Sequence, residues 1–522
     1  MTRPASPAIL LCMKPTQKNP YQLLHAWIDK TAMYMIVLYM LSILVVCSLV
    51  TGALGLVNQS VIDQLASLVV VLITGYGMSV VCAKVRGITA NHHSSIITAL
   101  IIFFLVFPSH VPFDLAVLAG TVSFAIVSKY VFVFRGQHIV NPAALAVYVL
   151  GLTTLGAAAW WVASAWLLVP LVIAGSIVVA KVRKWAPVLS FLVVGFAVYL
   201  VEGVFAGADI AATWSQFFTV YPALFLGFFM LTEPFSMPPT KKLQIGYGAL
   251  VGALSNTALL NPVVLMSPEL ALVVGTLTFY PTTLRRKLFL ILESKREIAA
   301  STWEFVFTKP AHIVFKAGQY LEWMLPHAGA DIRGIRRYFT IASSPTEDKI
   351  RLALKVMNPG SSYKTALLAL PVGGVVVASQ RAGDFTLPHD KTKKIGMIAG
   401  GIGVTPFRSQ VQYMIDTNSG TNTQLFYCAN TKADVAYSDI WTVAASRIPF
   451  TLVPVLAKEP ASPDYETGFL TADILKRRSP DLLERTWYVS GPPPMVDATV
   501  KTLKGLGLTS SQIVQDFFPG LA

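Results

Sequence analysis

The sequence predicts a multidomain fold: a polytopic all-α membrane bundle of about ten transmembrane helices, then an antiparallel β-barrel, then an α/β domain with a parallel sheet. Three observations predict it. The 522 residues are 54% hydrophobic and only 13% charged, a balance too apolar for a wholly soluble protein. Long apolar runs recur from Thr31 to Tyr280, and charged residues return from Leu288 onward. Beyond that point, the pattern is first that of short strands and then that of alternating strands and helices.

The first half of the chain contains a series of apolar runs, most of them roughly 15 to 25 residues long, which is the length that crosses a bilayer as a helix. We expect spans near residues 31–54, 64–83, 95–108, 113–134, 142–157, 161–180, 186–206, 216–231, 244–259 and 263–280. They make up a membrane domain over residues 31–287, preceded by a polar N-terminal tail at 1–30. Membrane lipid is therefore an expected partner.

Basic residues mark every second connection between these runs. Lysine or arginine precedes the first span and follows the second, fourth, sixth, eighth and tenth, and the intervening connections carry neither. Because positive loops stay in the cytoplasm, we expect a multi-pass protein of the cell (inner or plasma) membrane with both termini cytoplasmic. This topology also accounts for the net charge of +14, so no nucleic-acid partner is expected.

Two soluble domains follow the bundle. Residues 288–390 contain short alternating runs at 304–307, 320–324 and 350–356, which are typical of antiparallel strands and predict a small β-barrel. Residues 391–522 contain apolar strands at 394–399, 424–428 and 486–490, separated by helical stretches. That alternation predicts a parallel sheet, whose strand ends are where a nucleotide would bind.

A glycine-rich turn directly follows the first strand of the parallel sheet and precedes a predicted helix. Its residues are Gly400, Gly401, Gly403, Thr405 and Pro406. Small residues let the backbone approach a pyrophosphate, and the amide groups at the start of a helix favour its charge. A tight strand-to-helix connection without a ligand is the alternative.

Further motifs flank this turn in order. Upstream lie Gly318-Gln319-Tyr320, the segment Arg337–Ser344, Lys355-Val356 and Gly360-Ser361-Ser362, and downstream lies Ser490-Gly491-Pro492-Pro493-Pro494-Met495. This series resembles the ferredoxin–NADP reductase superfamily. The resemblance implies an FAD-binding barrel at 288–390 and an NAD(P)-binding α/β domain at 391–522, with FAD and either NADH or NADPH as cofactors.

The resemblance also implies roles on the barrel. In the superfamily, a strand with the pattern Arg-x-[Tyr/Phe]-[Ser/Thr] holds the flavin. Arg337 would bind the FAD pyrophosphate, Phe339 would pack against the isoalloxazine and Thr340 would hydrogen-bond near its reactive nitrogen. A guanidinium matches phosphate oxygens in a fork, and an aromatic face packs on a flavin ring. The other implied FAD contacts are Tyr338, Lys355, Gly360, Ser361 and Ser362.

On the nucleotide side, Gly400, Gly401, Gly403, Thr405 and Pro406 form the implied phosphate turn, and Gly491, Pro492 and Met495 form the turn that faces the nicotinamide. Ser490 stands where the superfamily often has Cys beside the hydride path, so Thr340 and Ser490 are the implied catalytic residues. Phe518 resembles a C-terminal aromatic that can cover the flavin. Residues 429–432, where ribose specificity is set, carry the signature of neither nucleotide, so NADH and NADPH both stay open.

Three segments of the predicted bundle are unusual for lipid-facing helices: Ser94–Ala99, Asn141–Ala144 and Phe229–Ser236. Helix caps at Ser94 or Asn141 and an aqueous position for Glu233 would explain each one alone. Taken in order, they resemble the membrane family shared by the D subunit of Rnf complexes and the B subunit of the sodium-translocating NADH:quinone reductase. The Ser-Gly-Ala-Thr sequence that carries covalent FMN in that family is absent. An implied second flavin, FMN or riboflavin, would therefore be noncovalent.

Several functions follow from these patterns. In the leading interpretation, NAD(P)H gives hydride to FAD, and single electrons then enter the bundle toward a second flavin, a quinone or a redox protein. A redox-driven Na⁺ or H⁺ pump and a membrane scaffold that only senses nucleotide are alternatives. A haem-carrying ferric reductase or NAD(P)H oxidase is disfavoured, because the eight histidines do not pair within the spans. No metal site is expected, since Cys12, Cys47, Cys82 and Cys428 are not spaced as ligands.

Overall fold

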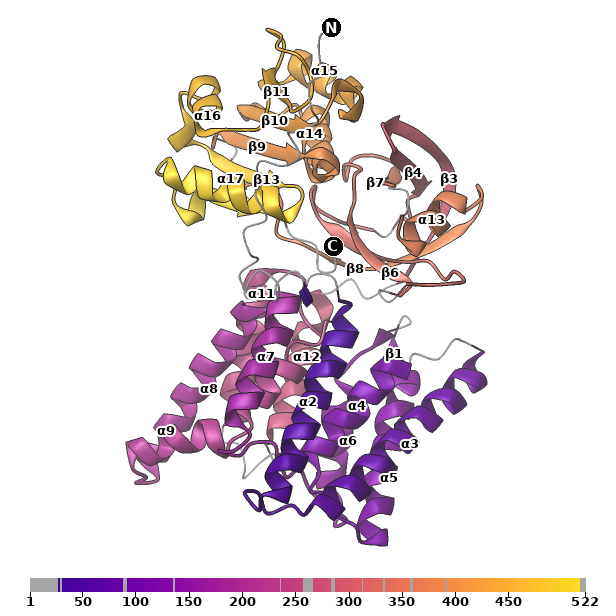
Figure 1. Ribbon diagram of the computed structural model, residues 1–522, viewed down its shortest axis with the longest axis vertical. Coiled ribbons are helices and arrows are strands. Elements are labelled where there is room, and N and C mark those ends of the chain that lie inside the picture. Colours follow the sequence, from indigo (N-terminus) through magenta and orange to yellow (C-terminus); the bar gives the residue numbers. More distant parts are fainter. Residues whose placement is uncertain are drawn as a thin grey trace, which may run out of the picture.

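The computed structural model describes residues 27–28, 31–87, 92–134, 137–234, 236–256, 266–282, 287–311, 313–331, 334–356, 360–388, 390 and 392–516. A helical bundle forms one end of the molecule, and a barrel and a parallel sheet lie together at the other end (Figure 1). The predicted antiparallel sheet followed by a parallel-sheet nucleotide domain is confirmed. Phe518 lies outside the described residues.

The bundle contains α2 (Met33–Ala53), α3 (Val61–Arg86), α4 (His92–Leu105), α5 (Pro112–Val131), α6 (Pro142–Gly151), α7 (Leu168–Val182), α8 (Trp185–Phe205), α9 (Ile210–Thr219), α11 (Lys241–Ser255) and α12 (Pro268–Phe279). Within the described ranges, α2, α3, α5 and α8 are long and apolar enough to cross a membrane, and α4, α6 and α7 are shorter apolar helices. Large apolar side chains such as Ile73 on α3 and Val193 on α8 are exposed, which suits lipid rather than water. The expected count of ten spans is not shown.

The segment expected as a span at 216–231 is not one helix. After α9 ends at Thr219, the chain begins again as α10 (Ala223–Phe225) and a π-helical turn, η1 (Leu226–Met230). Pro222 separates them, because its nitrogen carries no hydrogen to continue the helical ladder. α6 is also short, and its 10 residues reach only about 15 Å. Short helices of this kind bring polar helix ends into a membrane bundle.

The barrel contains β3 (Leu288–Ala299), β4 (Thr302–Thr308), β5 (Tyr320–Met324), β6 (Arg336–Thr340), β7 (Lys349–Lys355), β8 (Val375–Ala382) and one helix, α13 (Ser362–Ala369). Its strands run in the order β6-β5-β8-β3-β4-β7, and neighbours are antiparallel. Alternate side chains, including Leu290, Leu321 and Trp323, fill its core, as expected from the two-residue period of a strand.

The parallel domain contains β9 (Ile395–Gly400), β10 (Thr423–Ala429), β11 (Phe450–Leu456), β12 (Glu466–Thr467), β13 (Thr486–Ser490) and β14 (Ile513–Gln515), with helices α14 (Thr405–Asp416), α15 (Ser438–Arg447), α16 (Ala472–Arg478) and α17 (Pro493–Gly505). The strand order is β12-β11-β10-β9-β13-β14. The chain leaves β9 toward β10 and later returns to its other side as β13. This reversal is a topological switch point, where open parallel sheets bind ligands.

The barrel edge formed by β6 and β8 faces the bundle (Figure 1). Just beyond β8, the Asp384 carboxylate accepts a hydrogen bond of 3.0 Å from the backbone amide of Lys241, where α11 begins. Lys184, which precedes α8, interacts electrostatically with the same carboxylate. The barrel therefore rests on the basic ends of α8 and α11.

Candidate functional site

The glycine-rich turn lies at the switch point, between β9 and α14. Gly401 adopts a φ of 51°, in the left-handed region that glycine tolerates best. A Cβ on Gly403 would lie 2.6 Å from both the Gly491 Cα and the Ser490 carbonyl oxygen. The turn after β9 therefore packs directly against the turn after β13. Thr405 and Pro406 begin α14, and the Thr405 amide donates to the Ile402 carbonyl oxygen, so the turn and the helix form one continuous helical start beside the expected phosphate position.

Ser490 lies where these two turns meet. It is 1% exposed, and its hydroxyl donates a hydrogen bond of 2.8 Å to the Asp516 carboxylate. The Asp516 backbone amide in turn donates to the Val489 carbonyl oxygen. Met495 packs against Gly400, close to Pro492. Sequence reasoning identified Ser490 but missed Asp516, because Asp516 lies outside every motif.

The strand that carries the predicted flavin contacts has two different faces. Thr340 pairs with Tyr320 and Tyr338 pairs with Glu322 across β5 and β6. Because side chains alternate along a strand, these four residues share one face, which we call the outer face. The Tyr320 and Tyr338 rings meet edge to face at 5.8 Å. Tyr320 also interacts electrostatically with Asp516, so the outer face adjoins the nicotinamide turn.

Two buried polar atoms near this face lack a hydrogen-bond partner among the described residues: the Thr340 hydroxyl and the Gln380 side-chain nitrogen. Gln380 also adopts a φ of 50°, which is uncommon for a residue other than glycine. An unsatisfied buried polar group costs about 1–3 kcal/mol. Ring nitrogens and carbonyl oxygens of an isoalloxazine would pair with such groups, so the outer face fits a flavin.

Phe339 is the residue expected to pack against the isoalloxazine, and that role stays a prediction. It lies on the inner face with Leu321, is 7% exposed and belongs to the barrel core. Its ring lies 5.9 Å from that of Tyr363. The period of two places Tyr338, not Phe339, on the outer face, and Tyr338 was also among the predicted FAD contacts. The pattern identified the strand correctly, but the face each ring occupies depends on pairing with β5.

Arg337 lies at the start of α13, among the predicted pyrophosphate contacts. Its guanidinium donates a hydrogen bond of 2.8 Å to Asp331 and lies 5.4 Å from the centre of the Tyr363 ring. The Ser362 hydroxyl accepts a hydrogen bond from the Asp331 amide, and Ser361 caps α13. Arg337 and the start of α13 lie together, and a phosphate bound there would compete with Asp331; their contacts with FAD stay predictions. Gly360, just before the cap, is exposed.

Lys355 connects the two soluble domains. Its amine forms an ion pair of 2.8 Å with Asp434, which follows β10. Burial would raise the pKa of Asp434, but the hydrogen bond and charge of Lys355 outweigh burial and hold that pKa below its usual range. In the structure, Lys355 therefore pairs with the parallel domain rather than with the segment 360–362.

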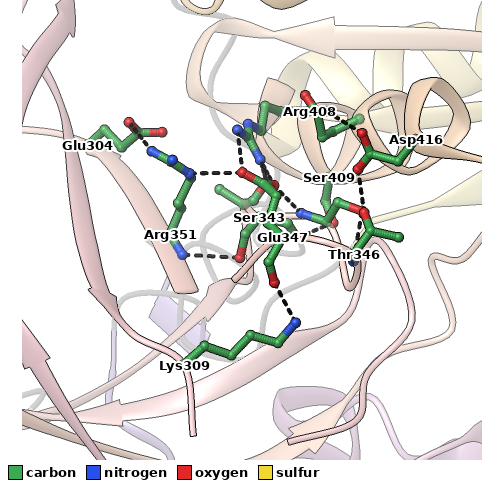
Figure 2. Close-up of polar contacts among 12 residues, drawn as sticks. Glu304, Lys309, Ser343, Thr346, Glu347, Arg351, Arg408, Ser409 and Asp416 are labelled. Carbon is green, nitrogen blue, oxygen red and sulfur yellow. Dashed lines mark hydrogen bonds and ion pairs between the residues drawn. The ribbon is translucent and has the colours of Figure 1, made fainter. Parts of the chain in front are cut away.

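A second connection, which sequence reasoning missed, joins α14 to the loop after the flavin strand (Figure 2). Glu347 accepts hydrogen bonds from Arg408 on both carboxylate oxygens and a bond of 3.0 Å from Arg351. The Ser409 hydroxyl donates to the Ser343 carbonyl oxygen at 2.6 Å. Burial would raise the pKa of Glu347, but the Arg408 hydrogen bond and charge hold it below the usual value. This clamp, Glu347 with Arg408 and Arg351, fixes the phosphate turn relative to the barrel.

One cavity of the bundle is lined by residues from all three of the unusual membrane segments. Ser94, Asn141 and Glu233, one from each segment, all line it. The Asn141 side-chain nitrogen donates a hydrogen bond of 2.9 Å to Glu233, and the Asn141 side-chain oxygen caps α6. Capping therefore explains part of the Asn141 role, while its pairing with Glu233 could not be read from either segment alone.

Tyr34, at the start of α2, connects this cavity with the barrel. It lines the cavity, and its hydroxyl lies within electrostatic range of Glu233 on one side and of Glu322 and Arg336 on the other. Glu322 accepts a hydrogen bond of 3.3 Å from the Tyr338 hydroxyl. Side chains thus lead from the outer face of β5 and β6 to the bundle cavity.

Comparison with known proteins identifies the soluble unit. Residues 397–501 match the family described as the oxidoreductase NAD-binding domain. The chain is 29% identical over 232 residues to the reductase subunit of glycine betaine monooxygenase from Chromohalobacter salexigens, covering 42% of this chain and 62% of that protein. It is 30% identical over 229 residues to the reductase subunit of an aromatic O-demethylase from an Amycolatopsis species, covering 42% and 66%. The crystal structure of a cytochrome P450 reductase from Amycolatopsis aligns with a TM-score of 0.40 and 26% identity, covering 44% and 70%.

The chain therefore spans less than two thirds of the length of either curated relative. Its C-terminal unit is an oxidoreductase unit that uses NAD(P)H and FAD. The roles assigned above to single residues stay predictions.

Proposed function

We propose that this chain is a membrane-bound oxidoreductase in which electrons from NAD(P)H pass through bound FAD into the helical bundle. The observation that carries this proposal is the position of Tyr34, which lines the bundle cavity and lies within electrostatic range of Glu322 and Arg336 of the barrel. The barrel face that fits a flavin and the membrane cavity are thus neighbours. A soluble acceptor would require no such cavity.

Residues of the parallel domain bind the nicotinamide nucleotide, and residues of the barrel bind FAD. The amides that begin α14 bind the nucleotide pyrophosphate, and the Gly403–Gly491 contact sets the width of the nicotinamide crevice. Arg337 and the start of α13 bind the FAD pyrophosphate. Thr340 holds the reactive edge of the ring, and the Tyr338 ring packs on its face. When bound, FAD supplies the conversion of two-electron hydride chemistry into single-electron transfer.

In the same proposal, the bundle belongs to the Rnf D-subunit and sodium-translocating reductase B-subunit type, with about ten crossings when its shorter helices are counted. Its cavity marks the place of the next electron carrier, which is a noncovalent flavin or a quinone, because its lining combines apolar side chains with the polar groups of Ser94, Asn141 and Glu233. A redox protein docked at the membrane is a further acceptor. The basic ends of α8 and α11 meet the barrel, which supports a cytoplasmic position for the reductase unit.

A cation pump is a second candidate function, and a buried acid favours it. Glu269, on α12, is 2% exposed and accepts a hydrogen bond of 2.5 Å from the Trp160 indole. An ionisable residue buried within a membrane bundle often marks an ion path. NADH-dependent ²²Na⁺ uptake or acidification in sealed proteoliposomes would support pumping. Electron transfer without either ion movement would reject it.

The main proposal is tested on protein purified in detergent. We expect a flavin absorbance spectrum that NADH or NADPH bleaches without oxygen, and acid extraction should release one FAD per chain. A second extracted flavin would identify the carrier in the cavity, whereas a single flavin together with reduction of decylubiquinone would favour a quinone. Protein that stays colourless after FAD is added, and that oxidises neither nucleotide, would overturn the proposal.

A further inference from the structure

An acid lines the bundle cavity, and a base lies just behind its lining. Glu233, after η1, is held by Asn141 at 2.9 Å and lies 3.4 Å from the Ser236 hydroxyl. The Lys129 amine, from α5, donates hydrogen bonds to the Ser94 carbonyl oxygen at 2.8 Å and to its hydroxyl at 3.1 Å. Lys129 and Glu233 also interact electrostatically. Lys129 therefore places a positive charge behind Ser94, which lines the cavity together with Glu233.

Other side chains that line this cavity are uncharged, and many are apolar. They include Tyr34, Val37, Ile97, Thr98, Ile101, Val178, Phe229 and Thr232. An electron that enters such a cavity places a negative charge in a medium of low dielectric constant, which is costly unless a positive charge arrives as well. A carrier that takes up a proton with each electron avoids that cost. Quinones and flavins share this chemistry, through a carbonyl oxygen or a ring nitrogen.

We propose that Glu233 delivers protons to the redox carrier bound in this cavity. The inference rests on the proposed function above. Glu233 takes a proton from water at the cavity mouth, passes it to the carrier as electrons arrive from the flavin side, and is protonated again from the same water. Lys129 offsets the negative charge of the Glu233 carboxylate between transfers, and Asn141 orients that carboxylate. For each NAD(P)H oxidised, the carrier gains two electrons and two protons: NAD(P)H, one H⁺ and oxidised carrier give NAD(P)⁺ and doubly protonated reduced carrier.

The test separates steps that need protons from steps that do not. Ferricyanide accepts electrons without protons, whereas decylubiquinone needs two. In Glu233→Gln, we expect flavin bleaching by NAD(P)H and ferricyanide reduction to stay within twofold of wild type. Decylubiquinone reduction should fall roughly 10- to 100-fold, because a positioned general acid contributes at least that much. Glu233→Asp, which keeps a carboxyl group, should recover most of the rate.

Controls and further measurements make the result specific. Glu202→Gln removes an acid of α8 that does not line the cavity and should leave decylubiquinone reduction unchanged. A solvent isotope effect on that step, and proton uptake followed with a pH indicator in a single turnover, should both be lost in Glu233→Gln. The pH dependence of decylubiquinone reduction is also measured in Tyr34→Phe and Lys129→Gln and compared with that of wild type and Glu233→Gln. Tyr34 on α2 and Lys129 on α5 are chosen because both lie within electrostatic range of Glu233.

The outcomes distinguish this inference from the proposed function. If wild-type flavin is not bleached by either nucleotide, the proposed function fails. If wild type reduces decylubiquinone and Glu233→Gln does so equally fast with the same pH profile, only the proton role of Glu233 is overturned. If the carrier is a resident flavin, extraction gives two flavins per chain, and the slowed step in Glu233→Gln is bleaching of the second one. If Glu233→Gln does not fold, Asn141→Ala, which removes the amide that orients the carboxylate, should show a smaller loss of the same step.

Discussion

The two halves of the molecule build their sites in different ways. In the soluble half, the turns at 400–405 and 490–495 meet because parallel strands bring their carboxyl ends to one edge, as topology requires. In the bundle, Ser94, Asn141 and Glu233 meet because α4 and α6 begin, and η1 ends, around one cavity. A sheet therefore assembles a site from local motifs, whereas a bundle assembles one from helix ends that the sequence separates widely. The predictions below test this contrast.

The largest effect is expected in the soluble half, at the contact of the two turns. In Gly403→Val, the Cβ would overlap the backbone of Gly491, which lies 2.6 Å from its position. The turns must separate, and a displacement near 1 Å at a reaction site costs roughly 100-fold in rate. We expect at least that loss in NAD(P)H-dependent flavin bleaching, measured by stopped flow. Gly420→Ala, where no atom lies within 4 Å of the new Cβ, should bleach normally; equal rates in the two variants would reject the close contact.

The sequence predicted the soluble half more completely than the bundle, for physical reasons. Strand periodicity and the motif order placed the barrel, the parallel sheet and the turns around Gly401 and Gly491. The same patterns could not show which face of β6 each ring occupies. Phe339 belongs to the buried cluster of the barrel, and its expected contact with the flavin stays a prediction. The patterns also missed the ion pair of Glu347 with Arg408, because neither residue belongs to a motif and their contact depends on domain docking.

In the bundle, hydropathy identified apolar segments but not where helices break. The interruption at Pro222 divides one expected span, and the Asn141–Glu233 hydrogen bond joins residues that no local pattern connects. A prediction of the cavity would have required knowing which helix ends face one another. Hydropathy carries no such information, because both lipid-facing and buried helix positions are apolar.

The next largest effect concerns the clamp between the soluble domains. Arg408 is 5% exposed, and its replacement by Met leaves Glu347 buried without its main partner. Breaking a buried ion pair costs about 3 kcal/mol, so we expect the reductase unit of Arg408→Met to unfold at a clearly lower temperature. Calorimetry on the full chain measures this. The exposed Arg447→Met on α15 is the matched control, and equal losses in both variants would show that the clamp adds no stability.

The clamp should also depend on pH in one direction. The pKa of Glu347 is below its usual value in the folded chain, so its contribution is complete at neutral pH and is lost as the pH falls through the folded pKa. The stability difference between wild type and Glu347→Gln should therefore be constant near pH 7 and shrink below about pH 4.5. A difference that grows on acidification would contradict this assignment.

A smaller effect is expected at the outer face of the barrel. The Thr340 hydroxyl is buried without a partner among the described residues, so Thr340→Val keeps the shape and removes an unsatisfied group. We expect the flavin-free protein to be as stable as wild type or more stable, by up to about 1 kcal/mol. Bleaching of bound FAD by NAD(P)H should slow roughly tenfold, since one hydrogen bond to the ring is lost. A variant that loses stability without FAD but bleaches normally would show that Thr340 serves only the barrel.

The smallest effect is expected from replacing either of the two aromatic residues of β6, Tyr338 or Phe339. Comparing them tests whether the strand face on which a ring lies, rather than its position in the motif, decides whether it contacts the flavin. Tyr338→Leu removes the ring on the outer face, where aromatic contacts contribute about 0.5–1.5 kcal/mol. We expect FAD to bind up to about tenfold more weakly, with a shifted flavin absorbance spectrum and little change in the stability of the flavin-free protein. Phe339→Leu should do the opposite, because its ring packs in the barrel core beside Tyr363: lower stability and an unchanged flavin spectrum. Fluorescence titration with FAD and thermal unfolding of both variants measure these effects. A flavin spectrum that shifts only in Phe339→Leu would show that Phe339, as the motif predicts, contacts the flavin.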